Sequence, residues 1–90
     1  MGYGALVITT LPSLVLSANP NRVELNITNV GASSIYLGMD ANTTTLNAGI
    51  LLVSSGTYST ARYANNCWLG PIYAACATGS GPALYWEVVL

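Results

Sequence analysis

The stretch NPNRVELNITNVGASSIYLGMD, residues 19–40, contains two segments of alternating apolar and polar residues, each preceded by a turn. Val23, Leu25 and Ile27 alternate with the polar residues Arg22, Glu24, Asn26 and Thr28, as in a strand with one buried face. After the turn NVGA, which is typical of a chain reversal, the alternation resumes from Ser34 to Met39. We therefore predict two strands that pair antiparallel to each other.

The same period of two recurs along the rest of the chain wherever Gly, Pro and Asn leave enough residues free, and helical periodicity is absent. In the last strand, residues 84–90, Leu84 and Trp86 begin an apolar face that alternates with Tyr85 and Glu87. Further strands are predicted where Leu6 and Ile8 face inward, where Leu14 and Leu16 face inward, and at 50–53, 57–62 and 72–77.

About eight short strands with turn residues between them predict an all-β fold, because two stacked sheets allow alternating strands to bury their apolar faces. Ninety residues suffice for one domain. We therefore expect a single-domain antiparallel β-sandwich over residues 1–90, jelly-roll-like or a small barrel. Residues 1–5 are expected to form a flexible N-terminal arm.

The composition combines 52% hydrophobic residues with only 6% charged residues, whereas ordinary soluble domains have about 25% charged residues. No run is long enough for a spanning helix, and MGYGALVITTLP (1–12) lacks the basic start of a signal peptide. We expect a soluble protein made in the cytoplasm, with no membrane partner. Two arginines and a net charge of −1 do not favour nucleic-acid binding. The apolar surplus indicates protein partners, including copies of the chain itself.

Side chains that carry chemistry are few. The sequence has no histidine, which removes the usual base of Ser or Cys nucleophiles and the commonest metal ligand. The acids Glu24, Asp40 and Glu87 are well separated, and Glu24 and Glu87 fall on polar strand faces. We therefore expect no enzyme, no cofactor, no metal and no small-molecule ligand.

Cys67 and Cys76 do not have the spacing of a redox CxxC motif or a zinc knuckle. Two reduced thiols in the core or an interface are expected, and a disulfide is the alternative. Tyrosines and tryptophans can anchor a protein interface or stack on a sugar. With so few charged groups, the core and a protein interface are favoured over a glycan platform.

Three segments together resemble a broad group of small tailed-phage virion proteins. The resemblance rests on NPNRVELNITNVGASSIYLGMD (19–40), GILLVSSGTYST (49–60) and GPIYAACATGSGPALYWEVVL (70–90). It implies a β-rich structural component of the particle, and a capsid decoration or cement protein in particular. Such a protein acts by binding and needs no titratable site.

The resulting expectation is a non-enzymatic virion protein on the outer capsid surface, bound to the major capsid protein and most naturally a homotrimer. The alternatives are a neck, tail or baseplate component and a glycan-binding host-attachment module. The interface candidates are a Gly-Tyr-Gly segment ahead of the first strand and an aromatic cluster around a polar loop. These residues are Gly2, Tyr3 and Gly4, and Tyr58, Tyr63, Asn65, Asn66 and Trp68.

Overall fold

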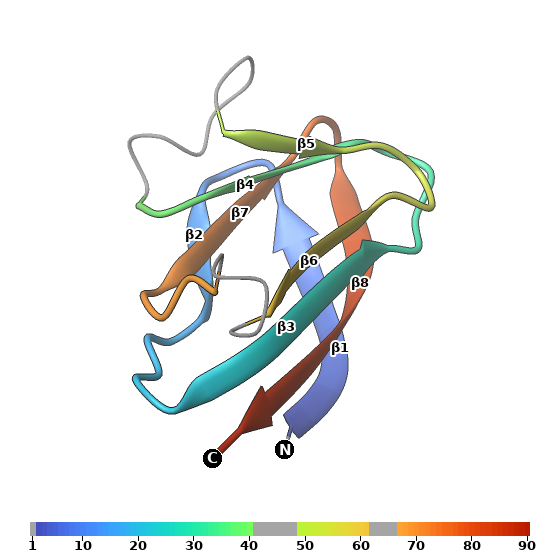
Figure 1. Ribbon diagram of the computed structural model, residues 1–90. Coiled ribbons are helices and arrows are strands. Elements are labelled where there is room, and N and C mark those ends of the chain that lie inside the picture. Colours follow the sequence, from blue (N-terminus) through green and yellow to red (C-terminus); the bar gives the residue numbers. More distant parts are fainter. Residues whose placement is uncertain (1, 41–48, 62–66) are drawn as a thin grey trace.

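The computed structural model describes residues 2–40, 49–61 and 67–90, and shows an all-β sandwich of two four-stranded antiparallel sheets (Figure 1). Each of the eight predicted strands is present. Their bounds are β1 (Gly2–Thr9), β2 (Ser13–Leu16), β3 (Arg22–Asn29), β4 (Ile35–Gly38), β5 (Ile50–Leu52), β6 (Thr57–Ala61), β7 (Ile72–Cys76) and β8 (Ser80–Val89). The described residues contain no helix that is long and apolar enough to cross a membrane.

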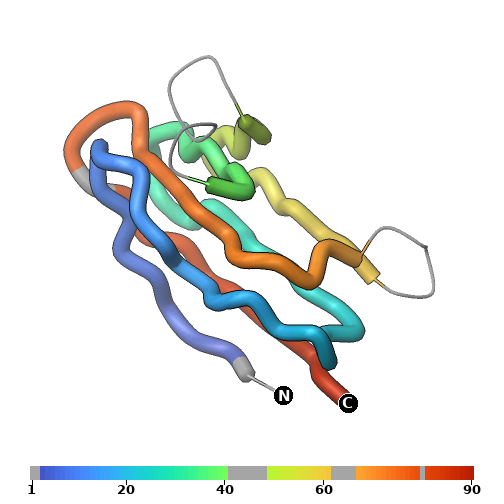
Figure 2. Tube along the Cα trace, turned by 90° about the vertical axis from the view of Figure 1, so that its left-hand side faces the viewer, coloured from blue at the N-terminus to red at the C-terminus, as the bar shows by residue number. Residues whose placement is uncertain are grey.

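The strand order is that of one long hairpin, in which the first four strands pair with the last four and which is folded into two layers. β1 pairs with β8, β2 with β7, β3 with β6 and β4 with β5, all antiparallel. Pairing of β3 with β8 and of β4 with β7 then completes two sheets, ordered β1-β8-β3-β6 and β2-β7-β4-β5. This is the strand order of an eight-stranded jelly roll. The first and last strands therefore lie side by side (Figure 2).

The core lies between the sheets and is built from the inward positions of both layers. Leu25 and Ile27 of β3 and Ile35 and Leu37 of β4 are buried, as the alternation predicted, and so is Ile8 of β1. Burial of these side chains is the main source of stability, about 1.5–3 kcal/mol for each large aliphatic residue. The core cluster consists of Ile8, Leu25, Ile27, Ile35, Leu37, Leu52, Ile72, Ala74, Cys76 and Ala83.

The predicted pairing of the two strands in residues 19–40 is wrong, because β3 and β4 belong to different sheets. The turn between them carries the chain across the sandwich. Buried Asn29 fixes this crossing: its Nδ2 donates to the carbonyls of Ser33, at 2.8 Å, and Leu52, at 3.0 Å, and its Oδ1 accepts from the Gly31 amide. A Cβ on Gly31 would lie 2.6 Å from Pro82 Cδ, so only glycine fits this approach.

The predicted side-chain orientation is also wrong in three strands. In β8 the inward positions are Ala83, Tyr85 and Glu87, whereas Leu84 and Trp86 are about half exposed. In β2 the pairing with β7 shifts register between Leu14 and Leu16, and Leu14 is exposed. In β3 a register shift against β8 between Arg22 and Glu24 turns Arg22 inward, although it was predicted on the polar face.

Residues 2–5, expected as part of a flexible arm, are the first half of β1. Gly2, Tyr3, Gly4 and Ala5 pair with β8 in the continuous register that runs from Gly2↔Glu87 to Thr9↔Ser80. This segment is therefore part of the sandwich and does not precede it. The segment's exposed side chains belong to a sheet face, which fixes the direction in which they point.

Candidate interaction surface

The outer face of the sheet β1-β8-β3-β6 is divided into a polar half and an apolar half. On β3 and β6 it presents Asn26 and Ser59, which hydrogen-bond to each other, and Thr28 and Thr57, whose hydroxyls are 3.0 Å apart. On β1 and β8 it presents uncharged, largely apolar side chains. We call these the apolar strip, which consists of Tyr3, Ala5 and Val7 of β1 and Pro82, Leu84 and Trp86 of β8.

The strip is contiguous because its members are direct cross-strand neighbours. The register places Tyr3 opposite Trp86, Ala5 opposite Leu84 and Val7 opposite Pro82, and opposed residues in an antiparallel pair share one face. Tyr3 is 82%, Val7 75%, Leu84 50% and Trp86 46% exposed. An aromatic side chain presents about 150–250 Å², so the strip as a whole exposes a few hundred Å², which is the size range of functional patches on monomers.

The strip exists because β1, and β8 between Pro82 and Trp86, carry uncharged, largely apolar side chains on both faces. Leu6 and Ile8 of β1 point into the sandwich while Tyr3 and Val7, in the same strand, point outward. Strands that are apolar on both sides are typical of sheets covered on both sides. Apolar residues at both odd and even positions of these strands therefore indicated this surface in the sequence. The prediction of a single, inward apolar face for residues 84–90 missed it.

The predicted interface residues fall in two separate places. Gly2, Tyr3 and Gly4 lie in β1, where Tyr3 is part of the apolar strip. Tyr58 of β6 faces inward, and it lines a cavity together with Trp68. The other three candidates, Tyr63, Asn65 and Asn66, lie outside the described residues.

The cavity has a volume of about 270 Å³ and lies between the sheets at the β5–β6 side of the sandwich. Most of the side chains that line it are apolar, and Tyr58 and Asp40 contribute a hydroxyl and a carboxylate. Burial raises the pKa of the Tyr58 hydroxyl, the nearby Cys67 raises it further, and Arg22 acts in the opposite direction. That hydroxyl therefore stays protonated at neutral pH and can donate a hydrogen bond. The lining residues are Leu37, Gly38, Met39, Asp40, Gly49, Ile50, Tyr58, Trp68 and Ile72.

Trp68 is held from three sides. Its ring packs against the core cluster, its Nε1 donates to the Pro71 carbonyl at 2.9 Å, and its ring passes so close to Gly70 that a Cβ there would lie 2.3 Å from Trp68 Cζ2. These contacts are internal to the domain. They favour a structural role for Trp68 over the docking role predicted from the sequence.

Replacing Trp68 by alanine is therefore expected to lower the thermal midpoint by more than about 10 °C, because a packed aromatic contributes several kcal/mol to the free energy of unfolding. Differential scanning calorimetry of the free protein measures this. A midpoint within a few degrees of wild type, combined with weaker binding to a partner, would instead assign Trp68 to an interface.

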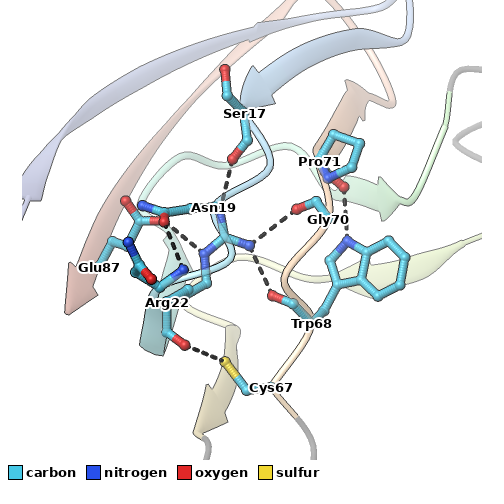
Figure 3. A network of polar contacts seen from close by, with 9 residues as sticks. Ser17, Asn19, Arg22, Cys67, Trp68, Gly70, Pro71 and Glu87 are labelled. Atoms are coloured by element: carbon cyan, nitrogen blue, oxygen red, sulfur yellow. Dashed lines mark hydrogen bonds and ion pairs between the residues drawn. The ribbon is translucent and has the colours of Figure 1, made fainter. Parts of the chain in front are cut away.

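A buried arginine, predicted to lie on the polar face of its strand, joins four separate parts of the chain (Figure 3). Arg22 is fully buried, and its Nε lies 2.6 Å from Glu87 Oε2. Its Nη1 donates to the carbonyls of Trp68 and Gly70, at 2.8 and 3.1 Å, and its Nη2 to the Ser17 carbonyl at 2.9 Å. A planar guanidinium suits such multiple, fixed bonds. This network holds the segments that enter β3 and β7 against β8.

Both cysteines are free thiols. Cys76 is buried and its Sγ donates to the Thr78 carbonyl, while half-buried Cys67 donates to the Arg22 carbonyl. In the part of the chain that the structure describes, no group of three or more His, Cys, Asp or Glu could hold a metal ion.

Comparisons with known protein families, with curated proteins and with solved structures found no match to this chain.

Proposed function

We propose that this protein is a non-enzymatic structural protein that acts by protein–protein contact. The observation that carries the proposal is the apolar strip, a contiguous exposed surface without a charged side chain. Covering such a surface removes apolar area from water, and its lack of charge avoids the several kcal/mol that each buried, unpaired ion would cost.

Within this class, we propose a capsid decoration protein that binds the major capsid protein on the outer surface of a tailed-phage particle. The resemblance of residues 19–40, 49–60 and 70–90 to small virion proteins supports this role, and the jelly roll is compatible with it because viral capsid domains use that strand order. The fold alone does not decide the function, because lectins and cupins share it. The strip is the surface that would lie against the shell.

Binding to purified capsid shells that lack decoration proteins tests this proposal. The expected result is co-sedimentation of the protein with the shells at hundreds of copies per particle, saturable and insensitive to moderate salt. The salt dependence follows from the uncharged strip, since screening weakens only charged contacts. A few to a dozen copies would indicate a neck, tail or baseplate component, and no binding at all would overturn the decoration role.

The second candidate is a glycan-binding module for host attachment, favoured by one observation. The cavity brings two aromatic side chains, Tyr58 and Trp68, close to the carboxylate-bearing Asp40. Aromatic faces stack on sugars and carboxylates accept hydrogen bonds from their hydroxyls. A glycan array with the isolated domain separates the two functions: reproducible binding to one class of sugar would favour this candidate over decoration.

A further inference from the structure

β1 differs from the other edge strands of the sandwich. The two sheets have four edges, formed in the described part of the chain by β1, β6, β2 and β5. β5 has three residues, β2 has four and a register shift, and β6 exposes the polar Thr57 and Ser59. Short length, irregular pairing and polar side chains are common ways of protecting an edge from pairing with another chain.

None of these protections is present on β1. It has eight residues and pairs with β8 in continuous register, and its sequence GYGALVIT contains no proline and no charged residue. The first charged residue of the chain is Arg22. A long, regular, apolar edge strand is a template for strand addition, so an edge of this kind in a stable protein is one that another strand covers.

We propose that two copies of this chain associate through their β1 edges, which pair antiparallel around a two-fold axis at Ala5. The two four-stranded sheets then form one continuous eight-stranded sheet. The proposal does not depend on the function proposed above.

A second copy fits this edge because β1 is self-complementary in that register. Tyr3 of each copy lies opposite Val7 of the other, and aromatic residues opposite β-branched residues are among the favourable cross-strand pairs. Both faces match: Tyr3, Ala5 and Val7 stay on the outer face, while Leu6 of one copy lies beside Gly4 of the other on the inner face. Because the strand is uncharged, self-pairing brings no like charges together.

The contact is long relative to the molecule. In this register residues 2–8 of each copy pair, and seven residues at about 3.4 Å each span roughly 24 Å, about two thirds of the 35 Å long axis of the domain. Pairing extends the apolar strip across the two-fold axis, so that the β8 and β1 side chains of both copies form one wider surface. An edge contact of this symmetry closes with two copies. The proposal is therefore a dimer, in place of the homotrimer expected from the sequence.

Two matched lysine substitutions test this geometry. Ala5→Lys places two lysines face to face at the two-fold axis, whereas Leu84→Lys adds the same charge to the cross-strand neighbour, one strand away from the edge. Both positions are exposed, so both variants should fold. By light scattering and sedimentation at micromolar concentration, wild type and Leu84→Lys should have twice the 9.3 kDa chain mass. Ala5→Lys should dissociate at least about tenfold more readily, because opposed like charges disfavour association.

A cysteine at the same position tests the register independently of any effect of charge on folding. Opposed residues of an antiparallel pair have Cα atoms about 4.5–5.5 Å apart, within disulfide range. Ala5→Cys should therefore form a covalent, reductant-sensitive dimer under mild oxidation, while wild type, with only Cys67 and Cys76, should not.

Three results would overturn the proposal: a monomeric or trimeric wild type, an Ala5→Lys variant that dimerises as wild type does, or no crosslink through Ala5→Cys. These results are separable from a failure of the decoration role. A monomer that still coats shells would contradict only the dimer, and a dimer that binds no shell would contradict only the function.

Discussion

Replacing Leu25 by aspartate is expected to abolish folding. Leu25 is fully buried in β3, a central strand, between Thr60 of β6 and Glu87 of β8. The change removes about 1.5–3 kcal/mol of apolar burial and places a second carboxylate beside Glu87, at a cost of several kcal/mol. Their sum reaches the lower part of the range of about 5–15 kcal/mol that is the whole stability of a small domain.

Far-UV circular dichroism and a urea titration measure this effect. The neighbouring change Glu24→Gln is the control, because Glu24 is half-exposed on the outer face of the same strand, where substitutions stay within about 0.5 kcal/mol. A folded Leu25→Asp protein, or equal losses in the two variants, would mean that the faces of β3 are misassigned.

Replacing Arg22 by methionine is expected to lower the free energy of unfolding by about 4 kcal/mol or more. The change leaves the Glu87 carboxylate, 16% exposed, without its cation, and breaking a buried ion pair from one side costs about 3–5 kcal/mol. It also removes the donor from the carbonyls of Ser17, Trp68 and Gly70. The thermal midpoint should fall by more than about 15 °C, since each kcal/mol shifts a domain of this size by about 4–8 °C.

The double variant Arg22→Met/Glu87→Leu separates the ion pair from the rest of the network. Because it removes the stranded carboxylate as well, it should be more stable than Arg22→Met alone, although the three carbonyls still lack their donor. Calorimetry of the wild type, the two single variants and the double variant completes the cycle. An Arg22→Met protein that melts within a few degrees of wild type would show that the network is dispensable.

The fold class was predictable from the sequence because each strand combines a period of two with turn residues at its ends. Val23 to Ile27 is the clearest case, since polar neighbours leave only one way to place the strand. The same rule failed for β8. Leu84 and Trp86 compete there with Ala83 and Tyr85 for the interior, and residues of similar hydropathy on both faces leave the phase undetermined. Pairing with β1 and β3 decides it, and that information is non-local.

Two further features depend on backbone irregularities, which cannot be predicted from the alternation of apolar and polar residues. The register shift in β3 turns Arg22 inward, and the crossing at Asn29 sends the chain to the other sheet where a hairpin was predicted.

The candidate surface was predicted only in part. Tyr3 was predicted as an interface residue, but as part of a flexible arm. Leu84 and Trp86, which belong to the same strip, were predicted to face the core. Tyr58 and Trp68 were predicted as interface residues, and in the structure both side chains lie toward the interior. An aromatic residue serves a core and an interface equally well, so its chemistry alone does not distinguish the two.

We propose the apolar strip as the surface that binds the shell, and a pair of lysine variants distinguishes it from the rest of the sheet face. Leu84→Lys lies in the strip, and Thr57→Lys adds the same charge to the polar half of the same sheet face. Affinity for decoration-free shells is measured by co-sedimentation after calorimetry has shown that both variants are folded. We predict that Leu84→Lys binds at least about tenfold more weakly than wild type, because the contact would bury an unpaired charge, and that Thr57→Lys binds as wild type does. Equal binding by both variants, or a larger loss in Thr57→Lys, would contradict the claim.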